Sequence, residues 1–337
     1  MPLPHDAYQE GIRMLRLSNV HVSLTIEPAR GAQIVELSRA GDDVNALAFE
    51  TWDSPPAADG VSSYYDPELD WLSGYHGGWQ ETLPNAGQAS HLDGMPLPFH
   101  GEGSFIPWQV VESGPDHCVV ATHLRPTLSA TRSMTLSATH PAVQVATRVT
   151  NTGLLPVPMV WGHHPAFAAD AGTVLHLPAT RYSVDPAQPD GLDTTEGTWP
   201  TSSAPDGPVD LSRFSAATGQ RLVYCHGHDE GWAVVEQNGL LPHAALSWDV
   251  AAYPATWIWQ NRAATGFPWF GRLRCLAVEP QRAWPFDGLA GARSRGQELT
   301  VAPGRSVESW ITVALPEQLP AVITGVDQDG HVMGDRP

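Results

Sequence analysis

One stretch of the chain, residues 129–139, changes side-chain character at every position, and this limits the folds open to it. Serine or threonine occupies each odd position, and the residues between them are Ala130, Arg132, Met134, Leu136 and Ala138. The same period of two returns over residues 143–149. Successive side chains of a β-strand point to opposite faces, so the pattern predicts two half-buried antiparallel strands.

Elsewhere in the chain, shorter runs of β-forming residues are separated by glycine, proline and asparagine, which is typical of short strands joined by turns. With 31 glycines and 31 prolines, and no helical period longer than about two turns, a helical bundle is excluded. We predict an all-β fold, a large antiparallel β-sandwich forming one domain over residues 1–337. Residues 298–315 are predicted as a closing hairpin around Pro303 and Gly304, residues 52–98 as long loops, and residues 185–208 as a surface excursion, either a lid or an insertion.

Charge and cysteine content exclude several functions. The net charge of −18 argues against nucleic acid and anionic membrane surfaces as partners. All 18 basic residues are arginine, which excludes a Schiff-base lysine and a phosphate loop that needs lysine. Cys118, Cys225 and Cys275 form no paired motif, so neither a disulfide framework nor a zinc ribbon is expected. Without an export signal or a long apolar run, we expect a cytoplasmic protein; a homodimer is left open.

Two adjacent histidines end the stretch VPMVWGHHPAF at residues 157–167. In an extended strand His163 shares a face with Trp161 and Phe167, whereas His164 points to the other face. Only one of the two histidines can therefore serve a given pocket.

Two other stretches are candidate partners of this strand. PFHGEGSF contains His100 and Glu102, and LRCLAVEPQ places Glu279 at the end of the mostly apolar row Leu273, Cys275 and Ala277. Burial at the end of such a row raises the pKa of a carboxyl, and imidazole titrates near neutrality. A buried glutamate and histidines at one end of a sheet therefore predict a proton-transfer site.

These motifs resemble the aldose 1-epimerases, the galactose-mutarotase-like family, and most of all an uncharacterised branch of it. The resemblance covers residues 77–280 in the family's order: Gly77-Gly78 with Pro84, His100-Gly101, the segment from His163 to Phe167, and Glu279-Pro280. It implies the family's supersandwich fold, His164 as general acid, Glu279 as base and His100 as a substrate-orienting histidine. His163 and Ala166 replace the family's asparagine and tyrosine, the family's substrate arginine has no counterpart here, and Asp249 is the counterpart of its sugar-binding aspartate.

The function that the resemblance implies is mutarotation, the interconversion of the α and β anomers of a sugar. Glu279 would remove the proton of the anomeric hydroxyl while His164 protonates the ring oxygen, so no metal or organic cofactor is required. We expect these two side chains to face one cavity, a sugar-ring width apart. The expected partner is a small-molecule carbohydrate. The candidates for contact with it are Trp79, Glu81, Asn85, Glu102, Trp161, His163, Asp249, Trp259, Gln260 and Asn261.

Three other functions remain open at this stage. A non-catalytic carbohydrate-binding sandwich would bind the sugar without accelerating anomer exchange. A cupin-like metalloenzyme would use His100, Glu102, His163 and His164 as ligands. An enzyme of the same fold could use its glutamate and histidine for another proton abstraction, such as β-elimination. Each candidate also has a purely structural interpretation, as a core tryptophan or a histidine bonded to backbone, and residues 225–230 (CHGHDE) could be a metal cluster or a solvated loop.

Overall fold

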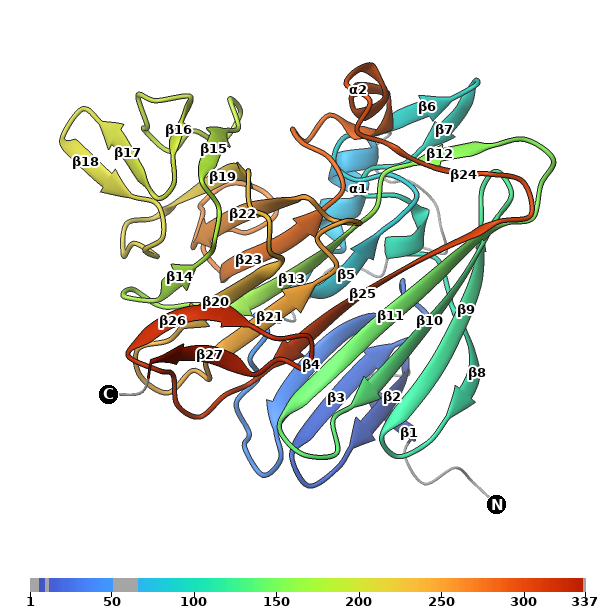
Figure 1. Ribbon diagram of the computed structural model, residues 1–337, viewed down its shortest axis with the longest axis horizontal. Helices are drawn as coiled ribbons and strands as arrows, with labels where there is room; N and C mark the ends of the chain where they lie inside the picture. The colour runs from blue at the N-terminus through green and yellow to red at the C-terminus, as the bar shows by residue number, and fades with distance from the viewer. Residues whose placement is uncertain (1–5, 10–11, 51–65, 336–337) are drawn as a thin grey trace.

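The protein is described here from a computed structural model covering residues 6–9, 12–50 and 66–335, and it consists mainly of two antiparallel β-sheets packed against each other (Figure 1). The larger sheet has eleven strands, in the spatial order β1 (Asp6–Gln9), β2 (Ile12–Ser18), β3 (Val22–Glu27), β4 (Gln33–Arg39), β5 (Gly78–Thr82), β13 (Gly162–Ala168), β23 (Arg274–Gln281), β22 (Ala255–Arg262), β19 (Gly219–His226), β15 (Arg181–Val184) and β16 (Glu196–Thr198). The smaller sheet has eight, in the order β14 (Val174–His176), β20 (Trp232–Glu236), β21 (Ala244–Trp248), β25 (Ser306–Ala314), β11 (Ala142–Asn151), β10 (Leu128–Leu136), β9 (His117–Leu124) and β8 (Gln109–Ser113).

The remaining elements are short. Four two-stranded sheets are formed by β6 (Ser90–Leu92) with β7 (Met95–Leu97), β12 (Val157–Met159) with β24 (Leu299–Val301), β17 (Thr201–Ala204) with β18 (Gly207–Asp210), and β26 (Val322–Val326) with β27 (Val332–Asp335). The helices are α1 (Pro67–Ser73), α2 (Gly288–Ser294) and the 3-10 turn η2 (Glu102–Ser104). The predicted all-β antiparallel sandwich is confirmed.

The alternating stretch behaves as predicted. It forms β10, whose buried residues are Leu128, Ala130, Arg132, Met134 and Leu136, while the residues between them are partly or fully exposed. Burying each large aliphatic side chain contributes roughly 1.5–3 kcal/mol, so this face fixes the register of β10 against β9 and β11. The buried arginine in this row is the one departure, and it has a charged partner on the other sheet.

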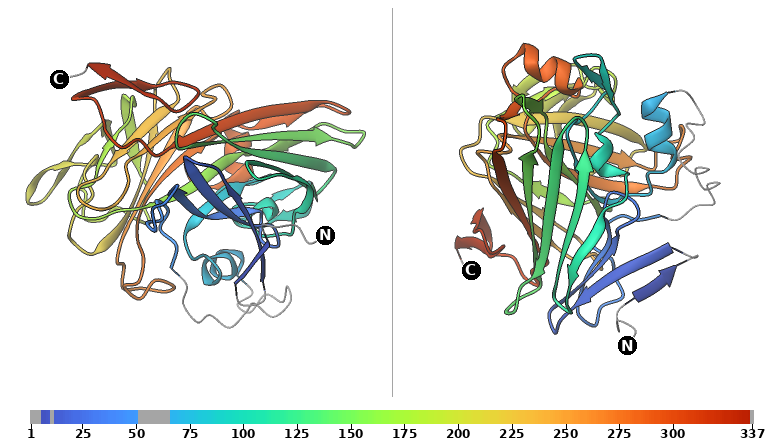
Figure 2. Two further views of the ribbon diagram at one scale, coloured as in Figure 1. Left: turned by 90° about the horizontal axis from the view of Figure 1, so that it is seen from below. Right: turned by 90° about the vertical axis from the view of Figure 1, so that its right-hand side faces the viewer.

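The eleven-stranded sheet is covered on both faces near its centre. Every residue of β5 and β22 is buried, as is all of β13 except Ala168 at its end. One face packs on the eight-stranded sheet. Helix α1 and residues 98–105, 263–272 and 282–287 pack on the other face, and in Figure 2 α1 lies on the side of the molecule away from the C-terminal hairpin.

Two local predictions were wrong. Residues 298–315 do not form a hairpin, because β24 pairs with β12 while β25 pairs with β11 and β21. Residues 66–98 are not mainly loop, since they contain α1, β6, β7 and the central strand β5; the first part of the predicted loop, residues 52–65, lies outside the described residues. In both cases a turn residue marks a local change of direction but does not select the strand that becomes the neighbour.

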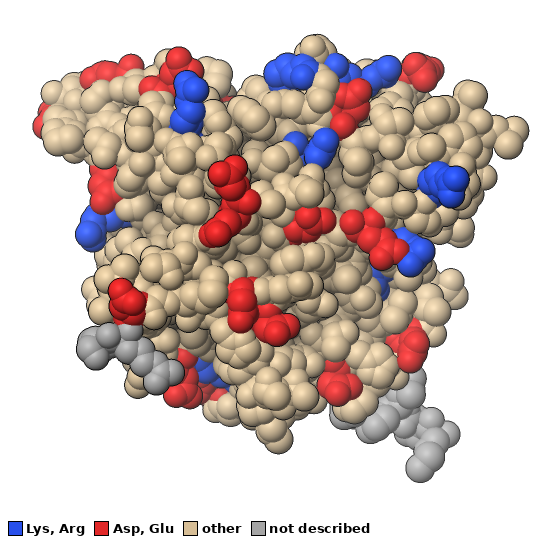
Figure 3. Space-filling view, in the orientation of Figure 1, with Lys and Arg blue, Asp and Glu red and all other residues tan. Residues whose placement is uncertain are grey.

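The surface turned to the viewer in Figure 1 carries carboxylates spread over several elements, with arginines gathered near its upper edge (Figure 3). None of the helices within the described ranges is both long enough and apolar enough to cross a bilayer.

Candidate active site

The register of three central strands brings His164 and Glu279 together. Strand β13 lies between β5 and β23, with Gly162 opposite Gln281 and Ala166 opposite Ala277, which places His164 opposite Glu279. Opposed residues of an antiparallel pair point to the same face. The His164 Nε2 atom lies 3.5 Å from Glu279 Oε1, on the face of the sheet that is turned away from the second sheet.

Gln281 supports this pair from the next position on the same face of β23. Its amide nitrogen donates to Glu279 Oε2 and to the backbone oxygen of His163, both at 3.4 Å. Glycine opposite it leaves the room that this requires, because a β-carbon on Gly162 would come within 1.8 Å of Gln281 Oε1. The carboxyl of Glu279 therefore accepts a hydrogen bond from Gln281 at Oε2 and has the imidazole of His164 beside Oε1.

His100 reaches the pair from the segment before η2. Its ring centroid lies 5.5 Å from that of His164, and its Nδ1 atom accepts a hydrogen bond of 3.2 Å from the backbone N–H of Gly87. That bond leaves the Nε2 atom of a neutral His100 as the protonated nitrogen. The backbone of His100 has a φ of 55°, and Gly101 follows at 74°, so a tight turn aims the ring at the sheet.

Gly101 is a position where a side chain cannot be accommodated. A β-carbon there would lie 2.4 Å from the backbone oxygen of Leu83. We expect Gly101→Ala to lower the free energy of unfolding by about 2 kcal/mol or more, from backbone strain and from this contact together. Urea unfolding measures it, with Gly94→Ala as control: Gly94 also has a positive φ, of 88°, but nothing lies within 4 Å of an added β-carbon. Equal losses in both variants would mean that the close approach has no energetic consequence.

Helix α1 and the residues just after it contribute two aromatic rings to the site, Trp71 from within the helix and Tyr75 from two residues beyond its last residue, Ser73. The indole of Trp71 lies 4.6 Å from the His100 ring and 5.9 Å from the His164 ring, between centroids, and stacks on Tyr75 at 4.7 Å. The hydroxyl of Tyr75 lies 3.4 Å from His164 Nδ1. Trp71 lies against both histidines and Tyr75 against His164, so α1 and the residues just after it form part of a cover above the sheet.

Strand β22 and the loop after it complete the cover. Trp259, on the same face as Glu279, contacts His164 at 5.9 Å and Trp269 at 5.3 Å between ring centroids. Residues 263–273 hold Trp269 in place through backbone hydrogen bonds made largely within the segment. The exposed fractions of His164, Glu279 and His100 are only 5%, 2% and 3%. The expectation of a sugar-ring width between imidazole and carboxyl is therefore wrong, because the two groups are in contact and both are buried.

Burial governs the protonation of the cluster. It raises the pKa of Glu279 well above its usual value, and the hydrogen bond from Gln281 lowers it only in part. Burial also lowers the pKa of His164 to about 4 and holds that of His100 well below its usual value, the latter with help from His164. A glutamate with a raised pKa is a stronger base than one in water, and a neutral imidazole can donate one proton and accept another.

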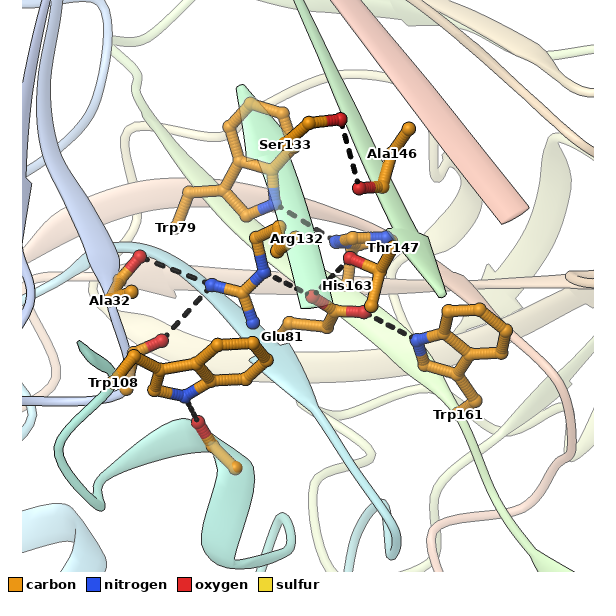
Figure 4. Close-up of polar contacts among 12 residues, drawn as sticks. Ala32, Trp79, Glu81, Trp108, Arg132, Ser133, Ala146, Thr147, Trp161 and His163 are labelled. Atoms are coloured by element: carbon orange, nitrogen blue, oxygen red, sulfur yellow. Dashed lines mark hydrogen bonds and ion pairs between the residues drawn. The ribbon is translucent and has the colours of Figure 1, made fainter. Parts of the chain in front are cut away.

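The other face of the same strands holds several of the predicted sugar-binding residues, in contacts between the two sheets (Figure 4). The Nε1 atom of Trp79 donates to His163 Nδ1 at 3.3 Å. Glu81 binds Arg132 Nε at 2.5 Å and accepts from Trp161 Nε1 at 2.5 Å. His163, Trp79, Glu81 and Trp161 thus lie in the interior of the sandwich, away from His164 and Glu279, and the structure does not bring them into the cluster.

The remaining candidates are also engaged elsewhere. Both oxygens of Glu102 bind Arg125. Asn85 bonds the backbone at residues 88, 98 and 289, and so shapes the loop beside His100 without facing the pair. Asp249 caps the turn at Ala251 and Ala252, and Gln260 points to the face of β22 opposite to Trp259. Of the predicted contacts, Trp259 is the one that lies against His164, and Asn261 holds the start of the segment that carries Trp269.

The buried histidines predict acid sensitivity. Burial lowers the pKa of both His163 and His164 to about 4, against a usual value of 6.5. Between pH 6.5 and 4 the unfolded chain binds more protons than the folded one, so the free energy of unfolding falls on acidification, by up to about 3 kcal/mol per histidine. Because burial raises the pKa of Glu279, acidification towards pH 4.5 increases the free energy of unfolding at this residue, and this offsets part of the loss from the histidines. Thermal unfolding between pH 7 and 4.5 tests this prediction. In His163→Gln the unfolding temperature should change less with pH than in the wild type, whereas His123→Gln, at an exposed position, should behave as the wild type does.

Across residues 6–9, 12–50 and 66–335, no three or more histidine, cysteine, aspartate and glutamate side chains are arranged to hold a metal. His163 and His164 point to opposite faces, and Glu102 is bound to arginine, so the four residues of the cupin-like arrangement do not converge. In the segment 225–230, His228 is buried beside Trp248 instead of being solvated.

Sequence reasoning missed Trp71, Tyr75, Trp269 and Gln281. Asp66-Pro67-Glu68 carries the signal of a helix start, since Asp66 accepts from the backbone N–H groups of residues 68 and 69 and proline is the first helical residue. That signal could have placed Trp71 on a short helix, with Tyr75 following just after its end. No local signal marks Trp269, whose role depends on where its loop folds.

Comparison with known proteins places the fold. The structure is similar to the Slr1438 protein from Synechocystis sp. PCC 6803, with a TM-score of 0.66, 17% identity, and coverage of 94% of this chain and 99% of that one. It also resembles a galactose mutarotase related enzyme from Lactobacillus acidophilus (TM-score 0.61, 13% identity, 90% and 97% covered) and a galactose mutarotase-like protein from Clostridium acetobutylicum (0.60, 14%, 93% and 98%). The expected galactose-mutarotase-like fold is thus confirmed.

A search of curated proteins gives no match. A family model, described as Domain of unknown function (DUF4432), matches residues 9–315, which include all the strands and side chains of the cluster above. The chain therefore belongs to the DUF4432 family, with a galactose-mutarotase-like fold.

Proposed function

We propose that the protein is an aldose 1-epimerase-like isomerase that interconverts the anomers of a small sugar. The observation that carries the proposal is the contact of 3.5 Å between His164 and Glu279, on one face of the sheet and beneath an aromatic cover. Ring opening of a hemiacetal needs one group to take the proton of the anomeric hydroxyl and another to protonate the ring oxygen. A buried carboxyl and an imidazole in contact can perform both steps and exchange roles on ring closure.

In the proposed reaction Glu279 takes the proton of the anomeric hydroxyl and His164 protonates the ring oxygen, while His100 donates a hydrogen bond to a neighbouring oxygen of the sugar. Rotation about the C1–C2 bond and closure then give the other anomer. Trp259 and Trp71 offer apolar surfaces of the kind that stack on a sugar ring. Acid-base assistance contributes about 10²- to 10⁴-fold, which suffices for a reaction that also proceeds in water.

A sugar can reach the pair only if the cover moves. The pair is closed to solvent by Trp71 from α1, by Tyr75 just after this helix and by Trp269 from residues 263–273. The latter segment makes most of its backbone hydrogen bonds internally, between Ala263 and Leu273 at its base and among residues 264–272. It can therefore shift as a unit without breaking the sheet, and this makes it the proposed entrance.

The test is exchange spectroscopy of anomeric protons by NMR, on a panel of free and phosphorylated aldoses. The proposal predicts that the exchange rate between α and β signals rises in proportion to protein concentration for at least one sugar. Binding to a sugar with an unchanged exchange rate would instead support the non-catalytic module. Consumption of the sugar with loss of both anomeric signals would support another proton abstraction on the same fold.

A further inference from the structure

The hydroxyl of Tyr75 makes a contact that the proposed mechanism does not use. It lies 3.4 Å from His164 Nδ1, on the side of the imidazole opposite to Glu279, and the two rings meet edge to face with centroids 5.3 Å apart. Tyr75 is only 2% exposed. The distance is near the upper limit for a hydrogen bond.

Whether the Tyr75 hydroxyl donates to His164 Nδ1 or accepts from it can be decided from the other acceptors open to the phenolic proton. His164 Nδ1 is the one hydrogen-bond partner of the Tyr75 hydroxyl within the part of the chain that the structure describes. Burial raises the pKa of Tyr75 well above its usual value, so the phenol keeps its proton. A buried hydroxyl proton without an acceptor is costly. If Nδ1 donated to the oxygen, the phenolic proton would have no acceptor, whereas donation by the phenol to Nδ1 satisfies both groups.

We propose that Tyr75 is a positioning residue that fixes His164 in the tautomer with its proton on Nε2, directed at Glu279. A neutral imidazole has one N–H, so an Nδ1 atom that accepts requires the proton on Nε2. The Nε2–H group then faces Glu279 Oε1, 3.5 Å away, and Gln281 donates to Oε2. The inference rests on the proposed function, because it states which proton His164 delivers to the sugar.

The groups around His164 come from several elements. Glu279 approaches from β23, Tyr75 from just after α1, and His100 from the segment before η2. The uncharged neighbours are Gln80, opposite His164 on β5, with Trp71 and Trp259. The competing acceptor is the backbone carbonyl of His164 itself, which would hold the proton on Nδ1. In that tautomer the lone pair of Nε2 would face the carboxylate, and no proton could pass to the ring oxygen.

The test is Tyr75→Phe, which keeps the ring and removes the hydroxyl. With ¹⁵N-labelled histidine, the wild-type His164 signals should show a protonated Nε2 and an unprotonated Nδ1, and the variant should show a mixed population. In anomer exchange, kcat should fall by about tenfold with KM nearly unchanged. The acidic limb of the pH profile should move to higher pH, because loss of the donor to Nδ1 makes it easier to protonate His164.

The control is Tyr182→Phe, which removes another buried hydroxyl, one that donates to the backbone oxygen of Thr201 at 3.2 Å far along the sheet. It should leave the His164 signals and the pH profile unchanged. A wild-type His164 protonated on Nδ1, or signals unaltered in Tyr75→Phe, would overturn the inference. If no aldose is exchanged, the proposed function fails, but the ¹⁵N signals still decide whether Tyr75 sets the tautomer.

Discussion

Replacing Glu279 by glutamine is expected to reduce catalysed anomer exchange by about 10²- to 10⁴-fold, the contribution typical of a general base. The amide has nearly the same shape, so the Nε2–H of His164 retains an acceptor, but it cannot take a proton from the anomeric hydroxyl. The fold should survive, because burial raises the pKa of Glu279 and the neutral amide avoids the cost of ionising there. Above pH 4.5 the variant should therefore lose the decline in stability with rising pH that Glu279 contributes in the wild type.

The measurements are NMR anomer exchange and thermal unfolding from pH 5 to 8. Glu308→Gln is a matched control, since it makes the same change on an exposed face of β25, where the carboxylate pairs with Arg148. It should leave exchange unaffected. Wild-type exchange in Glu279→Gln would exclude this carboxyl as the base.

Breaking the ion pair between Glu81 and Arg132 is expected to have the largest effect on stability. The pair joins β5 of one sheet to β10 of the other, and its side chains are 1% and 4% exposed. Arg132 also donates to the backbone oxygens of Gly31 and Ala32, and its guanidinium lies 4.1 Å from the ring centroid of Trp108 (Figure 4). Burial alone would raise the pKa of Glu81, but the charge of Arg132 and further donors bring it below its usual value.

Arg132→Met should cost about 3–5 kcal/mol in urea unfolding at pH 7, because it leaves the Glu81 carboxylate buried without a counter-charge. The double variant with Glu81→Gln should be more stable than the sum of the two single losses predicts, since no buried charge remains. A loss below about 1 kcal/mol in Arg132→Met, or strictly additive losses, would show that the pair contributes little to holding the sheets together.

Strand β13 shows what can be predicted from the alternation of side chains along a strand. This alternation correctly assigns His163 and His164 to opposite faces of β13, and it places Glu279 on one face of β23 with Cys275 and Ala277. It cannot say which face meets the second sheet, because both faces of these strands are buried and no polar side marks the solvent. Trp79, Glu81 and Trp161 are predicted sugar contacts, but the structure places them between the sheets.

Several polar residues predicted to bind the sugar are hydrogen-bonded to other parts of the protein instead. Asn85, Glu102 and Asp249 have side chains suited to sugar hydroxyls, but each is occupied by backbone or arginine. Buried polar groups need partners, and those partners come from segments distant in the chain, such as Arg125 for Glu102. Only the folded structure shows which groups remain for a ligand.

The fold class and the strands with clear alternation follow from the amino-acid sequence, because alternation and turn residues act over a few positions. The motifs that resemble the aldose 1-epimerases indicate His100, His164 and Glu279, which converge on one face. Tertiary structure alone decided the pairing of β24 with β12, the aromatic cover from α1 and residues 263–273, and the contact between Tyr75 and His164. These depend on contacts between segments far apart in the chain, which no local pattern encodes.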